Sequence, residues 1–340
     1  IAGRTVLEIG PGSGANSLYT ASLRPARYVL VEANPTGVDD IERLFAAHPD
    51  WRRGLEVQPM LLGEYAKQAG GARFDVVLCE GVLSGVPNPE EILQQAAGFV
   101  APGGVLVITC IDHISYFPDT LRRLCARRLI RPDQSLREQV AVLRPVFRHH
   151  LARLKGMSRP HEDWIIDNLI NPASIGRLCS MPEAIAVVAG EFAFYASSPH
   201  FVADWRWYKA IAGEPAAINQ MVIDQYWQQV HNFLDARGLF PPRPAQANRA
   251  LEERCRSVRD ALREFETTRE RASLQAIRDQ LREAAQHIRG YSPDVAEAVG
   301  EVGAWLTQEP PDGRALAEAQ RFGGWFARGQ QYVSFTRRSP

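Results

Sequence analysis

Lysine is scarce in this chain of 340 residues. Among 39 basic residues, only Lys67, Lys155 and Lys209 are lysines. A genome of skewed composition produces the same bias, so the many arginines are not by themselves evidence of a binding function. The 39 acidic residues leave no net charge. The overall charge therefore favours neither nucleic acid nor a membrane surface as a partner.

Cysteine and long apolar runs are scarce as well. The five cysteines are odd in number and form no Cys-x-x-Cys pair, which argues against a zinc site and against a disulfide framework. We therefore expect no metal, and a reducing, cytoplasmic setting. No apolar run reaches membrane-spanning length and no signal-peptide pattern is seen, so no membrane partner is expected.

What the chain does have is a glycine-rich turn near its start, in the stretch TVLEIGPGSGANSLYTA at 5–21. Val6, Leu7 and Ile9 predict a strand that is buried on both faces. The glycines that follow permit a left-handed backbone and a close approach to a ligand. A helix then begins, and its free N–H groups favour a polar or anionic ligand group.

The glycine spacing alone leaves three interpretations open. Gly10-x-Gly12-x-x-Ala15 fits a dinucleotide fingerprint, and a strand–turn–helix without a ligand is also compatible. Two details favour another ligand. Gly10, Gly12 and Gly14 alternate, and Glu8 lies inside the apolar strand, where an unpaired carboxylate is costly to bury. We expect Glu8 to have its partner at the glycine loop.

Two further strands end in carboxylates. The strand RYVLVE closes on Glu32, which lies 22 residues after Gly10, a spacing that suits a ribose hydroxyl pair. A surface carboxylate at a strand end is the alternative. The strand FDVVLCE closes on Glu80, next to Gly81.

These stretches resemble class I S-adenosylmethionine-dependent methyltransferases. VLEIGPGSG is similar to the first motif of that family, and FDVVLCEGVLSGVPNPEEIL with APGGVLVIT is similar to its fourth strand, helix and fifth strand. The resemblance implies S-adenosylmethionine as cofactor and S-adenosylhomocysteine as product. It assigns Glu32 to the adenosyl ribose, and it places Met60 and Leu61 beside the adenine, although both would equally suit the core. The implied cofactor-binding residues are Glu8, Gly10, Gly12, Gly14, Glu32, Met60, Leu61, Glu80 and Gly81.

The resemblance also implies the architecture. We predict an α/β fold: a Rossmann-like, doubly wound, seven-stranded sheet whose last strand, at 330–336, enters antiparallel between the fifth strand and the sixth, at 192–196. The sheet domain would comprise residues 1–216 and 323–340, with a helical lid over about 112–173. Residues 217–322 would form a large all-helical insertion. Apolar residues recur there at steps of three and four, which predicts a hairpin turning near Thr267 or one long helix, used for packing or for a homodimer.

Ligands of a parallel sheet bind beyond the carboxyl ends of its strands. That rule brings the cofactor residues to one edge, together with the segments after the fifth and sixth strands. Substrate contacts are expected from Asp112, Asp163, Trp164, Ser198 and Trp205. The arginines between 122 and 159 form either a solvated helix face or a positive wall toward an anionic acceptor.

A hydroxyl acceptor must lose a proton as it attacks, and histidine is the commonest helper. His113 follows the fifth strand and ranks first. His161 ranks second because Asp163 could orient its ring, and His200, after the sixth strand, ranks third. An amine acceptor would need no base, and Asp112 could simply cap the following helix.

The predicted function is methyl transfer from S-adenosylmethionine to O, N or C of a small molecule or metabolite. Two alternatives stay open: a non-catalytic cofactor-binding scaffold that acts through its helices, and an NAD-dependent oxidoreductase. Ligand identity separates them.

Overall fold

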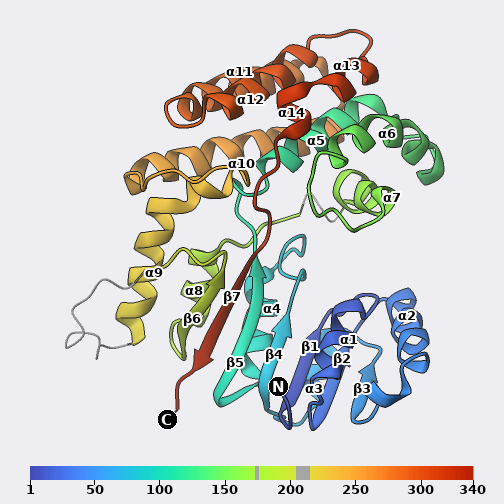
Figure 1. The fold of residues 1–340 in the computed structure, drawn as a ribbon, viewed down its shortest axis with the longest axis vertical. Helices are drawn as coiled ribbons and strands as arrows, with labels where there is room; N and C mark the ends of the chain where they lie inside the picture. The colour runs from blue at the N-terminus through green and yellow to red at the C-terminus, as the bar shows by residue number, and fades with distance from the viewer. Residues whose placement is uncertain (173–175, 204–214, 340) are drawn as a thin grey trace. The chain divides into compact units, whose positions relative to one another are not determined.

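The computed structural model describes residues 1–172, 176–203 and 215–339, so the predicted contact Trp205 lies outside the described residues. The chain alternates strands and helices at first and continues mainly as helices (Figure 1). The strands are β1 Thr5–Ile9, β2 Arg27–Val31, β3 Leu55–Gln58, β4 Phe74–Cys79, β5 Val100–Cys110, β6 Phe192–Ser198 and β7 Gln331–Arg337.

All seven strands form one sheet in the order β3-β2-β1-β4-β5-β7-β6. Strands β1 to β5 pair in parallel, and β7 lies antiparallel between β5 and β6. The doubly wound, seven-stranded fold predicted from the sequence is confirmed. Because β7 reverses direction, β6 runs parallel to β5, and the carboxyl ends of β1 to β6 share one edge.

The sheet is covered by two groups of helices. Helix α1 packs against α2, while α3 packs against α4 and α4 against α8. Their bounds are α1 Ala15–Ser22, α2 Pro35–Ala46, α3 Leu62–Gln68, α4 Pro89–Gly98 and α8 Met181–Val188, with a short 3-10 helix at Pro49–Trp51.

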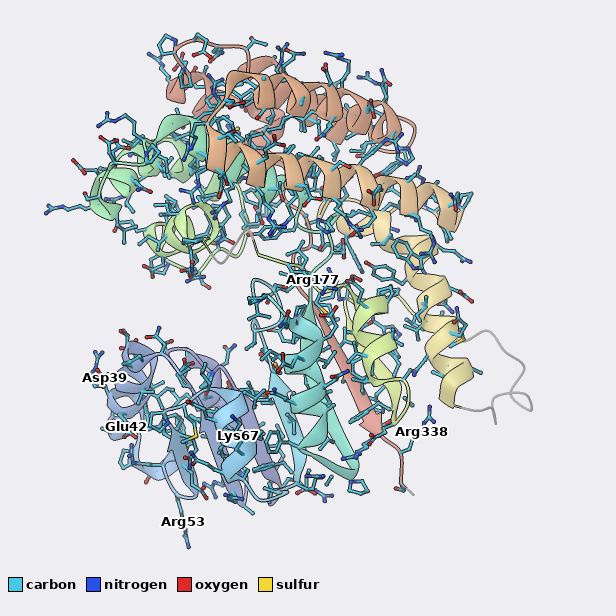
Figure 2. The ribbon with its side chains drawn as sticks, turned by 180° about the vertical axis from the view of Figure 1, so that it is seen from behind. Asp39, Glu42, Arg53, Lys67, Arg177 and Arg338 are labelled. Atoms are coloured by element: carbon cyan, nitrogen blue, oxygen red, sulfur yellow. The ribbon has the colours of Figure 1, made fainter. Side chains whose placement is uncertain are left out.

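Helix α2 shows why this sequence folds against the sheet. Gly37, Ile41 and Phe45 recur every fourth residue and are buried, as an amphipathic helix requires. The core there continues into Val6, Tyr28 and Leu30 of β1 and β2. Figure 2 shows Asp39 and Glu42 of the same helix pointing away from the sheet.

The remaining helices follow β5 in the sequence. They are α5 Phe117–Leu129, α6 Leu136–Leu151, α7 His161–Ile165 with a π-helical turn at Ile166–Ile170, α9 Pro215–Gln229, a 3-10 turn at Val230–Phe233, α10 Ala245–Thr268, α11 Arg271–Arg289, α12 Pro293–Trp305, α13 Gly313–Glu318 and α14 Gln320–Gly324. Of the two forms considered for the helical stretch, the structure has the hairpin. Helix α10 ends at Thr268, and Arg269 adopts a left-handed backbone.

The chain divides into two compact units. The sheet unit comprises Ile1–Ile111, Arg177–Tyr226 and Gln330–Pro340, and the helical unit comprises Asp112–Gly176 and Trp227–Gly329. We expected residues 112–173 to belong to the sheet domain and only 217–322 to stand apart. The difference has a physical reason: α5 packs against α10, and α6 against α13 and α14, so the two helical segments share one core.

The arginines of α5 hold that helical core together. Arg122 is fully buried and donates to the carbonyl oxygens of Phe322 (3.2 Å) and Trp325 (2.6 Å). Arg128 donates to Leu306 O (2.8 Å). Neither interpretation offered for this segment, a solvated face or a wall toward an acceptor, describes these side chains.

Candidate functional site

Three glycines build the loop between β1 and α1. Gly10, Gly12 and Gly14 have φ values of 67°, 59° and 79°, a region that other residues rarely adopt. A Cβ added at Gly10 would lie 2.5 Å from Val82 Cγ2, and one at Gly14 would lie 3.0 Å from Ile41 Cγ1. At Gly12 a Cβ would meet no described atom within 4 Å. Gly10 and Gly14 are therefore fixed by packing, and Gly12 leaves the loop surface open.

Glu32 follows β2 directly and faces this loop. Its Oε2 accepts a hydrogen bond from the N–H of Gly12 (2.9 Å), and its Oε1 accepts one from the N–H of Asn34 (2.8 Å). The side chain is only 8% exposed. A carboxylate has about four acceptor positions, so two remain for hydroxyl groups of a ligand. The loop and the carboxylate thus form one preorganised unit.

Helix α2 holds this unit from behind. Asn34 caps the helix, with its Oδ1 accepting from Thr36 N (3.1 Å), and Pro35 begins it. Gly37 lies so close that an added Cβ would be 2.9 Å from Gly12 O and 3.2 Å from Glu32 Cγ. Sequence analysis missed Gly37. The Asn34-Pro35 pair is a recognisable helix-start signal that could have placed it in the first turn.

The next strand along the sheet edge contributes Glu80 and Gly81. Burial raises the pKa of Glu80, although a hydrogen bond from the Tyr332 hydroxyl opposes that shift. The N–H of Gly81 donates to Thr109 Oγ1 on β5 (2.7 Å). The loop after Gly81 is held by the backbone of Arg177, whose carbonyl oxygen accepts a hydrogen bond from Gly85 N (2.9 Å). Figure 2 labels the Arg177 side chain.

Met60 and Leu61 follow β3 at the same edge. Met60 is half-buried, and Leu61 is 62% exposed despite its apolar side chain. An exposed leucine beside a site is suited to cover a flat apolar ligand group. Leu62, the third apolar residue of this run, is buried in the core.

Glu8 differs from the expectation. Its side chain is buried inside the sheet, and the Tyr28 hydroxyl of β2 donates to its carboxylate. Its partner is therefore a neighbouring strand and not the glycine loop, because side chains of adjacent strands on one face lie in contact. Burial raises the pKa of Glu8 to about 6, and the bond from Tyr28 only partly opposes this.

This shift predicts a pH effect on folding. A carboxyl group whose pKa is raised in the native state stabilises the fold at low pH, and that contribution is lost as the pH rises through the native pKa. For a shift from 4.5 to about 6, the loss is about 2 kcal/mol. Glu8→Gln should therefore raise the free energy of unfolding relative to wild type at pH 7.5 and not at pH 4.5, measured by urea denaturation.

Glu56→Gln is the control variant, in which the free energy of unfolding relative to wild type should change with pH in the opposite direction. Arg27 lowers the pKa of Glu56, so this variant should lose stability relative to wild type as the pH rises. If Glu8→Gln and wild type keep a constant difference between pH 4.5 and 7.5, the buried carboxyl does not titrate as described.

Asp112 and His113 lie at the start of the helical unit. Asp112 Oδ1 accepts from Ser115 N (2.7 Å), so it caps this turn. Glu252 of α10, which sequence analysis missed, accepts from the N–H groups of His113 (3.1 Å) and Ile114 (3.2 Å). No sequence motif marks Glu252, because it meets this turn only through the tertiary fold.

His113 is a weak base in this setting. Burial, together with the positive charges of Arg259, Arg256 and Arg263, lowers its pKa to about 3. A general base works best with a pKa near the operating pH. The first-ranked histidine is thus neutral at physiological pH but a poor proton acceptor.

The other predicted residues fall into two places. His161, Asp163 and Trp164 lie on α7 of the helical unit. In the described helical unit, His161 and Asp163 share no hydrogen bond or ion pair, since residues two apart on a helix point to different sides; Asp163 does not orient that ring. Ser198 ends β6 and His200 follows it, both exposed, at the sheet edge that carries the glycine loop.

The described residues form neither a metal site nor a membrane-spanning helix. No three histidine, cysteine or acidic side chains gather there as a metal site. No helix in the described ranges combines the length and apolar character that crossing a membrane requires. The five cysteines are all buried.

Comparison with known proteins shows the family to which the chain belongs. A family model described as "Methyltransferase domain" matches residues 1–180. Thiol S-methyltransferase TMT1B of Rattus norvegicus is 29% identical over 130 residues, which are 38% of this chain and 50% of that protein. Ubiquinone biosynthesis O-methyltransferase of Shewanella pealeana is 31% identical over 120 residues, 33% of this chain and 46% of that protein. The chain thus spans about half the length of the curated relatives it matches.

Solved structures with a similar fold include PKMT2 of Rickettsia typhi in complex with AdoHcy. It covers 65% of this chain and 46% of its own, with a TM-score of 0.44 and 12% identity. The family match covers more than half of the chain and includes the glycine loop, Glu32, Glu80 and Gly81. The dinucleotide interpretation of the glycine spacing is therefore set aside. The chain belongs to the methyltransferase-domain family, and it is a class I S-adenosylmethionine-dependent methyltransferase by fold, with S-adenosylmethionine as its cofactor.

Proposed function

We propose that the chain transfers the methyl group of S-adenosylmethionine to a nucleophilic atom of a small molecule. The observation that carries the proposal is the Glu32 carboxylate, which is held against the glycine loop with acceptor positions to spare. The names of two relatives supply further support, since one is a thiol S-methyltransferase and another an O-methyltransferase. Sulfur thus joins O, N and C among the candidate acceptor atoms.

The residues of the sheet edge fit the cofactor. Glu32 would accept hydrogen bonds from the ribose hydroxyls, and Leu61 would cover the adenine. Gly12 would let the loop backbone approach the ligand because no side chain stands above it. When bound, the cofactor supplies an electrophilic methyl on a sulfonium. The chain's own task is to align the acceptor and exclude water, which together account for much of the rate in such displacements.

A histidine base is a separate part of the proposal. Because the pKa of His113 is lowered, His200 and His161 are better candidates for the general base. His200 is exposed just beyond β6, and His161 lies on α7. An acceptor that attacks as a thiolate or a neutral amine needs no base at all. A pH–rate profile of His161→Gln and His200→Gln tests this once an acceptor is known; unchanged profiles in both would exclude these two histidines as the base.

Gly12→Val tests the cofactor site directly. The variant places a side chain in the open space above the loop and should weaken S-adenosylhomocysteine binding by at least about tenfold, measured by calorimetry. Gly71→Val is the matched control, because Gly71 also has a positive φ (80°) and open space around its Cβ, but it precedes β4 at the other end of the strand. Equal losses in both variants would mean that backbone strain is responsible. Tight NAD binding without any response to S-adenosylhomocysteine would refute the assignment.

A further inference from the structure

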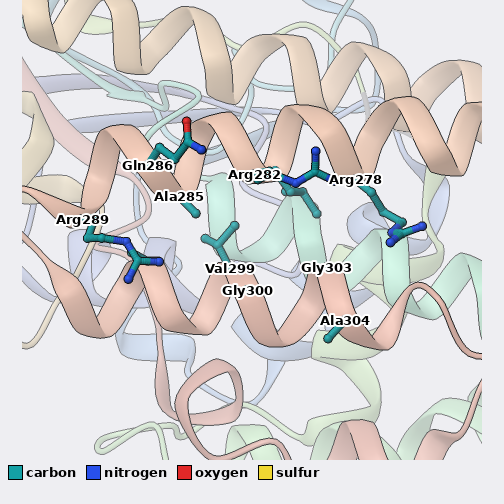
Figure 3. Close-up of a pocket in the computed structure, with 11 residues that line it drawn as sticks. Arg278, Arg282, Ala285, Gln286, Arg289, Val299, Gly300, Gly303 and Ala304 are labelled. Carbon is teal, nitrogen blue, oxygen red and sulfur yellow. The ribbon is translucent and has the colours of Figure 1, made fainter.

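A groove lies between α11 and α12 of the helical unit (Figure 3). Its volume is about 340 Å³. Helix α11 lines it with long polar side chains, and α12 lines it mainly with small ones. The described residues that line it include three arginines and no acidic residue: Arg278, Leu281, Arg282, Ala285, Gln286, Arg289, Ala296, Val299, Gly300, Gly303 and Ala304.

The three arginines form one stripe. Arg282 and Arg289 follow Arg278 by four and eleven residues, which places all three on the same side of a helix and spreads their charges over about 16 Å. Arg282 has a carboxylate nearby, Asp279 at 3.1 Å. Arg278 donates to Gln275 (2.8 Å), and Arg289 makes no hydrogen bond or ion pair with a described residue. The stripe therefore keeps most of its positive charge available.

Two glycines leave part of the α12 side of the groove without side chains. Gly300 and Gly303 lie inside α12, where glycine lowers helix stability relative to alanine. Packing within the chain does not require them, because a Cβ added at either would meet no described atom within 4 Å. Because neither residue has a side chain, the backbone of another segment could come close to α12 beside the arginine stripe.

We propose that this groove, the α11–α12 groove, binds an acidic helix of a partner protein. Charges that are spread over about 16 Å along one helix suit an elongated anionic occupant better than a small ion. A helix with carboxylates four and eleven residues apart would match the stripe, and its small side chains would lie over Gly300 and Gly303. A second copy of this chain is a poor occupant, because a two-fold dimer would set the arginine stripe against itself.

The test uses a fluorescein-labelled helical peptide of about 18 residues, with glutamates at the matching positions and alanines beside them. Fluorescence anisotropy should show saturable binding to the full chain at low salt, weakening as the salt rises. Exchanging the three groove arginines for glutamine should weaken it by at least about tenfold. Gly300→Leu, which fills the channel without touching a charge, should do the same.

Control variants distinguish binding in the groove from nonspecific electrostatic attraction of the acidic peptide to the protein surface. Exposed arginines elsewhere in the helical unit have the same charge and lie outside the groove, namely Arg144, Arg263 and Arg314. Their exchange for glutamine should leave peptide binding within about twofold. Absence of saturable binding to wild type, or equal loss in the groove and control variants, would overturn the proposal. So would arginine-dependent binding to phosphatidylserine vesicles but not to the peptide, or a dimer in solution that only the groove variants abolish.

Discussion

Gly37→Ala is expected to weaken S-adenosylhomocysteine binding by about tenfold to a hundredfold, although it adds only one methyl group. The added Cβ would lie 2.9 Å from the carbonyl oxygen of Gly12 and 3.2 and 3.3 Å from Cγ and Cδ of Glu32. Backbone at such a distance must move. The glycine loop and the carboxylate would then separate, and both are expected to contact the cofactor.

The control for this variant is Gly98→Ala. Gly98 ends α4, and a Cβ there meets no described atom within 4 Å, so cofactor affinity should stay at the wild-type value. Helix propensity favours alanine in both variants. A loss of affinity confined to Gly37→Ala would therefore reflect displacement of the loop.

A second ligand distinguishes positioning from general damage. If Gly37 acts by placing Glu32, the variant should also lose its preference for S-adenosylhomocysteine over the 2′-deoxy analogue, since that preference depends on hydrogen bonds to ribose hydroxyls. Wild-type affinity, or reduced affinity with the preference intact, would show that Gly37 does not position this carboxylate.

The sheet was predictable because its strands are short, apolar and closed by turn residues. The patterns at β1, β2 and β4 match a sheet buried on both faces, and the Asn88-Pro89 pair marks the start of α4 at Pro89. The fifth strand contains residues that are typical of a turn. Although Pro102, Gly103 and Gly104 lie near its start, β5 begins at Val100, and the β4–β5 pairing shifts register between Phe74 and Val76.

The residues of the cofactor loop were predictable from the sequence, but the packing of helix α2 behind the loop was not. Gly12 and Glu32 follow from spacing, whereas the closeness of Gly37 arises only when α2 packs on β2. Glu8 was misread for a related reason. A carboxylate inside a strand requires a partner, but which neighbouring strand supplies it depends on register, and β1–β2 pairing brings Tyr28 alongside.

The helical unit was the least predictable part. Its helices follow from apolar spacing, but the pairing of the 112–176 segment with 227–329 is a contact over long separations in sequence. The arginines between 122 and 159 could not be interpreted for the same reason, because a sequence does not show whether an arginine contacts water or a buried carbonyl oxygen. Arg122 and Arg123 are both fully buried.

The largest effect on folding is expected from Glu266→Ala in α10. The Glu266 carboxylate accepts from Nε of Arg123 (2.6 Å) and from Nε of Arg127 (3.0 Å), both on α5. Burial raises the pKa of Glu266, but the two arginines outweigh burial and hold that pKa below its usual range. Removing the carboxylate leaves the fully buried guanidinium of Arg123 with the carbonyl oxygen of Asn171 (2.7 Å) as an acceptor but without the charge of Glu266, which costs about 3 to 5 kcal/mol in comparable buried pairs.

Urea denaturation of the full chain, followed by circular dichroism, measures this loss. Glu253→Ala is the control on the same helix: Glu253 is 66% exposed and lies 3.7 Å from Arg256, so its removal should change the free energy of unfolding by no more than about 0.5 kcal/mol. Glu266→Gln should fall between the two, because it keeps an acceptor oxygen but loses the charge. Arg123→Met combined with Glu266→Leu should recover much of the stability, since apolar side chains of similar size can replace a buried pair. If Glu266→Ala costs no more than Glu253→Ala, water must reach the Arg123 guanidinium, and the ion pair is not what joins α5 to α10.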